Sequence, residues 1–280
     1  SATVLVPQPI TAQSAGSGMP MRTPDGQPDV SGVFTFRTLT PLQRPTQFEG
    51  KETLTAEEAA EFEASERRRQ NRDLFDPELG SGGYRPRSEG GVLSYNEFWY
   101  ERGVELTSDK RSSLIVDPLD GRRPPRTEAS RIAAREQGAY RREHMYDSYE
   151  NRSSADRCIM GFNAGPPMSS GAYNNNVMIF QTADHVVILN EMFLAARVVP
   201  LDGGQHVREE PRPGMGDSPG HWEGDTLVVD TTNFTAASIT PYIQGSGESM
   251  HLVERFTRVD ADTLLYQYTI DDPTTWTSSW

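Results

Sequence analysis

The chain of 280 residues is long enough for one large domain or two modest ones. Its 35% apolar residues, 24 Gly and 20 Pro predict a polar fold that is rich in loops. Asp and Glu outnumber Lys and Arg by 40 to 27, and this net charge of -13 argues against a nucleic-acid-binding surface. The apolar runs are much shorter than the roughly 20 residues that a membrane span needs.

The first 172 residues are expected to wrap around the rest of the protein. Residues 1–50 are extended and rich in proline, so they cannot form a core of their own. The uncharged opening segment is typical of what remains after a signal peptide is removed, which predicts a periplasmic or extracellular protein. The only cysteine, Cys158, excludes an internal disulfide, and we expect it to be buried and inert.

Two polar helices are predicted in this wrapping region. The first covers residues 55–72, where Thr55 and Glu58 match the capping box and acidic residues precede basic ones. The second covers residues 127–149 and is rich in Arg and Glu. Neither helix has a broad apolar face, so both are expected at the surface.

Residues 173–280 are expected to form an antiparallel meander or barrel, because β-branched and aromatic runs of strand length alternate with short Asp, Gly and Asn turns. The absence of predicted helices between these runs excludes parallel βαβ units, and closure into a barrel would remove the open edges. We expect one compact unit whose strands include the runs VMIFQT, HVVILNEMFLAARVV, DTLVVDTT, MHLVERFTRV and TLLYQYTI.

Two carboxylates are the candidate catalytic groups. Alternation in the strand MHLVERF places Glu254 on the same face as Leu252 and Phe256, and the same pattern places Glu191 beside Leu189 and Phe193. Inward carboxylates could serve in acid–base chemistry, with His251 or His185 as proton carrier and Arg255 or Arg197 as orienting charge. The alternative is that each carboxylate forms a structural pair with an arginine such as Arg197 or Arg255.

Polar and aromatic residues near the predicted strands are candidate ligand contacts. Asn174, Asn175 and Asn176 precede the first strand of the meander and would either line the barrel mouth or make turns. Further candidates are Tyr266, Tyr268 and Trp99. The spacing of the histidines matches no zinc motif and no nucleotide-binding motif occurs, so we expect neither a metal nor a cofactor.

Several stretches together resemble a family of exported bacterial proteins, and two of them also resemble the strands of small lipocalin-like barrels. The resemblance implies export and a β-rich barrel without specifying an activity, and it implies that similar proteins continue past the position of Trp280 with a tail containing Cys, His and Glu. The segments that carry it are TPDGQPDVSGVF, LTPLQRP, YNNNVMIFQTADHVVILNEM, HWEGDTLVVDTTNF and HLVERFTRVDADTLLYQYTIDDPTTWTSSW.

These observations favour a mainly β, exported protein that binds a small molecule inside its barrel, with acid–base activity of the hydrolase or lyase type as an extension. Two alternatives stay open. One is a carrier without turnover, and the other is a structural subunit of an extracellular assembly that packs residues 1–50 against a neighbouring copy. No nucleic-acid partner is expected.

Overall fold

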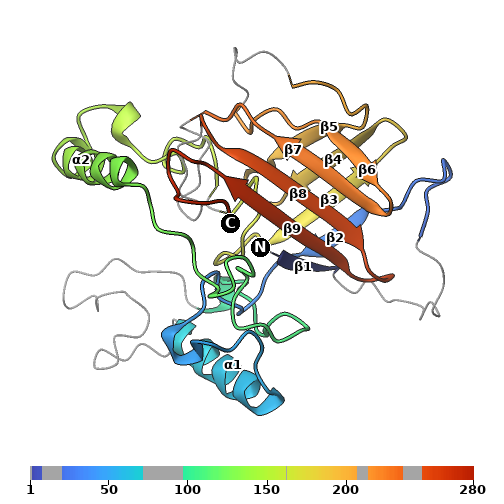
Figure 1. Cartoon of the computed structure of the whole chain (residues 1–280), viewed down its shortest axis with the longest axis horizontal. Helices are drawn as coiled ribbons and strands as arrows, with labels where there is room; N and C mark the ends of the chain where they lie inside the picture. The colour runs from blue at the N-terminus through green and yellow to red at the C-terminus, as the bar shows by residue number, and fades with distance from the viewer. Residues whose placement is uncertain (1, 8–20, 72–96, 162, 207–213, 236–247) are drawn as a thin grey trace.

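The computed structural model describes residues 2–7, 21–71, 97–161, 163–206, 214–235 and 248–280, so part of the predicted N-terminal arm lies outside the described residues. The described residues form one antiparallel β-sheet system and two α-helices (Figure 1). The helices are α1 (Ala56–Gln70) and α2 (Glu128–His144). The strands are β1 (Ala2–Pro7), β2 (Gly32–Thr35), β3 (Asn176–Gln181), β4 (His185–Asn190), β5 (Ala196–Pro200), β6 (Gly220–Glu223), β7 (Thr226–Thr231), β8 (His251–Arg258) and β9 (Leu264–Asp271).

The strands form two four-strand meanders, β2 to β5 and β6 to β9, and β1 pairs with β2 on one side and β9 on the other. Every pairing is antiparallel, which confirms the predicted meander and the exclusion of parallel units. In Figure 1 the second meander lies in front of the first, so the two pack as layers. The sheet also takes β1 and β2 from the N-terminal region, which was expected to wrap around the meander.

A closed barrel is not found. Within the described residues the ladder ends at β5 and β6, and these two edge strands share no pairing. They nevertheless lie close together, because the Gly203 N–H just after β5 donates to the Gly220 carbonyl of β6 at 3.3 Å. A Cβ on Gly220 would lie only 2.6 Å from Val199 Cγ1. Side chains rather than a backbone ladder therefore fill this junction.

The main core lies between the two meanders. Alternate residues of β8 point into it: Leu252, Glu254 and Phe256 are each 0% exposed, as the strand period predicted. Large side chains from β2, β9 and the C-terminal segment complete the packing, including Phe34, Tyr266 and Trp280. The interior between the layers is thus occupied by protein side chains.

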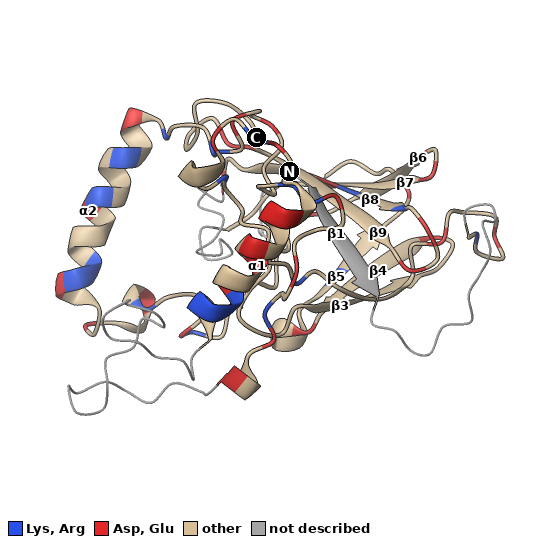
Figure 2. Cartoon of the chain, turned by 90° about the horizontal axis from the view of Figure 1, so that it is seen from below, with Lys and Arg blue, Asp and Glu red and all other residues tan. Residues whose placement is uncertain are grey.

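The two helices lie outside this core, as predicted for polar helices. Thr55 and Glu58 form the expected capping box at the start of α1, which buries only Ala59 and Phe62 in a small cluster separate from the main core. Helix α2 buries none of its residues, and Figure 2 shows it standing away from the sheet.

Candidate functional site

A buried ionic network crosses the core between the two meanders. Glu254 on β8 accepts a hydrogen bond from Arg197 Nη1 on β5 through Oε2, and Arg197 is only 6% exposed. The second oxygen, Oε1, accepts from the Tyr266 hydroxyl at 2.6 Å. Both oxygens of this carboxylate are therefore engaged by partners that stabilise its charged form.

Tyr266 on β9 extends the network to a loop. Its hydroxyl accepts a hydrogen bond from the Met168 N–H at 3.1 Å while it donates to Glu254. Burial, together with the nearby Glu254 charge and the hydrogen bond to it, raises the pKa of Tyr266 well above its ordinary value of 10.0. Tyr266 is thus a permanent donor to Glu254 at physiological pH.

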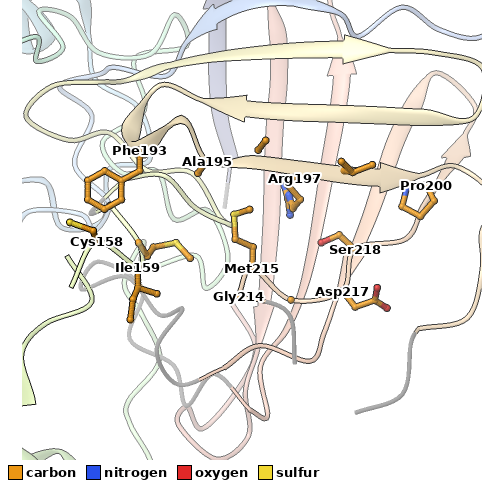
Figure 3. Close-up of a pocket in the computed structure, with 15 residues that line it drawn as sticks. Cys158, Ile159, Phe193, Ala195, Arg197, Pro200, Gly214, Met215, Asp217 and Ser218 are labelled. Atoms are coloured by element: carbon orange, nitrogen blue, oxygen red, sulfur yellow. The ribbon is translucent and has the colours of Figure 1, made fainter. Parts of the chain in front are cut away.

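A pocket with a volume of about 480 Å³ lies beside this network, and we call it the β5 pocket. Its walls come from β5 and the turn before it, from residues 158–161 and from residues 214–218. In Figure 3 the Arg197 side chain projects from β5 toward the 214–218 segment, with Met215 and Ser218 near it. A volume of this size is typical of small-molecule sites, which span about 300–1,000 Å³.

Arg197 joins the buried network to the β5 pocket. Its hydrogen bonds to described residues all leave from Nη1, to Glu254 and to Thr231 Oγ1 at 3.5 Å. Arg197 also lines the pocket. No described residue accepts a hydrogen bond from its Nε or Nη2, and neither nitrogen is fully enclosed by protein atoms. These two nitrogens therefore keep unused N–H donors that can be reached from the pocket.

Two histidines and two aspartates form a hydrogen-bonded chain that begins at the pocket wall. Asp217, which lines the pocket, has Oδ2 at 3.0 Å from Nδ1 of His206. Asp230 Oδ1 lies 3.3 Å from His206 Nε2 and 2.7 Å from His251 Nε2. The predicted proton carrier His251 is therefore part of this chain on the outer side of β8, whereas Glu254 points to the inner side of the same strand.

The expected inward position of Glu191 is wrong. The run 185–199 does not form one strand, because β4 ends at Asn190 and a short 3-10 helix, η6 (Met192–Leu194), follows with Phe193 at φ 61°. Glu191 is exposed, and its Oε2 accepts a hydrogen bond from Asn176 Nδ2 at 3.0 Å. The structure therefore does not pair Glu191 with Glu254, and a catalytic role for either stays a prediction.

The remaining candidate residues lie apart from the β5 pocket. His185 is exposed at the start of β4, and Arg255 pairs at the surface with Glu223 at 2.6 Å, so Arg197 is the partner of Glu254. Tyr268 is buried in the core, 5.7 Å from the Tyr266 ring. Trp99 is 63% exposed and packs edge-on against Phe98.

Asn174 and Asn175 lie in the loop that leads into β3, and Asn176 is the first residue of that strand. Asn175 is fully buried, and its side chain donates to the Glu101 carbonyl at 2.7 Å and accepts from the Gly171 N–H at 2.7 Å. Asn174 has φ 57°, a left-handed conformation that asparagine tolerates.

The residues that sequence reasoning missed are in loops. Met215, Asp217 and Ser218 line the pocket from the segment before β6, and Cys158, expected to be buried, is exposed at its rim. No periodic pattern marks such positions. The one available signal in the sequence is the presence of sulfur-containing residues, Cys158, Met160 and Met215, in segments predicted as loops.

In the described parts of the chain no group of three His, Cys, Asp or Glu side chains is arranged to hold a metal ion. Among these same parts, no helix is long and apolar enough to cross a membrane. Comparison of the whole chain with known protein families, with characterised proteins and with solved structures finds no match to any of them.

Proposed function

We propose that this protein is a carrier that binds a small molecule in the β5 pocket, in the exported setting that the family resemblance implies. The single observation that carries the proposal is Arg197, a nearly buried guanidinium that uses one nitrogen to hold Glu254 and presents the others to a pocket. An arginine that is merely structural would be expected to use more of its donors within the protein.

The location differs from the one that the sequence suggested. A lipocalin-like barrel would hold its ligand between the layers, but that space contains Phe256, Tyr266 and the Glu254 network, all fully buried. The β5 pocket lies instead at the junction of the two edge strands, where the ladder is not closed.

The arrangement supports binding more than turnover. Both oxygens of Glu254 are engaged, and Glu191 is on the surface. A general base must reach the proton that it removes, and neither carboxylate lines the β5 pocket.

Native mass spectrometry of the protein purified from its source tests the proposal. The Met215→Trp variant fills the pocket, because the Met215 side chain projects from the 214–218 segment toward β5 and lies near Arg197 (Figure 3). Met145→Trp is the matched control, because Met145 is 40% exposed and does not line the pocket.

We expect a bound small molecule in the wild type and in Met145→Trp, and its loss in Met215→Trp. Retention of the same molecule in Met215→Trp would place the binding site elsewhere and overturn the proposal, as would the lack of any bound molecule in all three proteins.

A further inference from the structure

We propose that the β5 pocket selects an uncharged molecule that carries a carbonyl or amide oxygen on an apolar body. This inference rests on the proposed function and adds the chemical class of the ligand. It follows from three properties of the pocket wall: the spare donors of Arg197, the balance of charge around it, and the apolar character of the remaining lining.

The spare donors require an acceptor. Arg197 is more than nine-tenths buried, and Nε and Nη2 form a planar fork facing the pocket while Nη1 is held by Glu254. A guanidinium nitrogen can only donate, so the ligand atom that meets it must be an oxygen or another acceptor.

The charges around the pocket disfavour an anion. Glu254 already neutralises Arg197, so a ligand carboxylate would not find an uncompensated cation. It would also lie near the carboxylate of Asp217, the acidic residue among the described residues of the lining. An anionic ligand would thus add a charge that the site cannot balance.

A cation is disfavoured for the opposite reason. It would face the guanidinium of Arg197, and it has no acceptor to offer the spare N–H groups. An uncharged acceptor satisfies Arg197 without disturbing its pair with Glu254.

Apolar side chains make up much of the rest of the described lining. Ile159, Met160, Phe193 and Met215 line the pocket, and thioether side chains adapt their shape to irregular apolar ligands. The ligand body should therefore be apolar and small enough for a space of about 480 Å³.

Three probes of nearly the same shape test the charge selection: benzamide, benzoate and benzamidine. Titration of each into the isotope-labelled full chain, followed by amide chemical shifts, gives the dissociation constants. We expect benzamide to bind at least about tenfold more tightly than either charged probe. We expect Met215→Trp to lose binding and Met145→Trp to keep it.

The role of Arg197 is tested with the double variant Arg197→Met/Glu254→Gln, which removes both charges together so that neither is left unpaired in the core. Toluene, which has no acceptor, serves as the control for pocket shape, and circular dichroism verifies folding. We expect the affinity for benzamide to fall about tenfold and that for toluene to stay the same.

Each outcome decides between the two proposals. Tighter binding of benzoate or benzamidine, lost in Met215→Trp, would overturn the ligand class while supporting the β5 pocket as a binding site. An unchanged affinity of the double variant for benzamide would overturn the role of Arg197. Binding of benzamide that Met215→Trp leaves intact would overturn the pocket itself.

Discussion

Removing one partner of the Arg197–Glu254 pair should destabilise the protein far more than breaking a surface pair. Arg197→Met keeps the length of the side chain but leaves the Glu254 charge in a position that is 0% exposed. Among the described residues, the Tyr266 hydroxyl at 2.6 Å would be its one remaining side-chain hydrogen-bond partner. Loss of one member of a buried pair costs about 3–5 kcal/mol, and this is the expected fall in the free energy of unfolding.

The Glu254 variant and the double variant complete a double-mutant cycle, which isolates the interaction energy between Arg197 and Glu254. Glu254→Gln keeps one acceptor oxygen but leaves the Arg197 charge, which is only 6% exposed, without its counter-ion, so we expect a loss of similar size, about 3–5 kcal/mol. The double variant leaves no unpaired charge, and its loss should be smaller than the sum of the single losses by at least about 1 kcal/mol.

Equilibrium unfolding in urea measures all three variants, with Arg255→Met as the matched control. Arg255 pairs with Glu223 at 2.6 Å, but the two side chains are 39% and 50% exposed, so its loss should cost less than about 1 kcal/mol. If Arg197→Met costs no more than Arg255→Met, or if the single losses simply add, the network does not hold the two meanders together.

Three further predictions follow from single residues. Tyr266 should stay protonated above pH 10 in an ultraviolet titration, because its pKa is raised in the folded protein. The stability advantage of the wild type over Tyr266→Phe should therefore be constant below about pH 10 and shrink as the pH rises above it. A constant advantage at every pH would contradict this. In urea unfolding, Gly216→Ala should lower the free energy of unfolding more than Gly26→Ala does, by at least about 1 kcal/mol. Both glycines have positive φ, but a new Cβ lies 2.6 Å from a backbone oxygen at Gly216 and meets no atom within 4 Å at Gly26. Thr55→Ala should cost about 1 kcal/mol in the same assay through loss of the α1 capping box, and an unchanged stability would show that the cap does not contribute.

The elements that sequence predicted best are those with local, periodic signals. The alternation around Glu254 correctly predicted its burial, and the Thr55 capping box correctly predicted the start of α1. The same alternation failed at Glu191, because Phe193 and Leu194 take positive φ values that end the strand and reverse the chain. A run of apolar residues carries no local signal for a reversal at Phe193 and Leu194, because the reversal is caused by the packing of the surrounding chain.

The partner of Glu254 and the position of the β5 pocket depend on long-range pairing. Sequence left Arg197 and Arg255 as equal candidates, because both lie on strands of similar character. The choice is made by the register, since Arg255 occupies the outer face of the same strand as Glu254, whereas Arg197 reaches across from the other meander. The pocket residues 214–218 are brought to β5 only by this same juxtaposition.

The unclosed junction between β5 and β6 links stability to the proposed function. In a closed barrel, a backbone ladder would join these strands and cover the side chains behind them. Here the described hydrogen bonds across the junction include those of the buried Arg197 Nη1 to Glu254 and to Thr231 Oγ1, the latter at 3.5 Å, and the bond from the Gly203 N–H to the Gly220 carbonyl. The same opening leaves Arg197 within reach of the pocket, so a variant that closed the ladder would be expected to stabilise the sheet and to exclude the ligand.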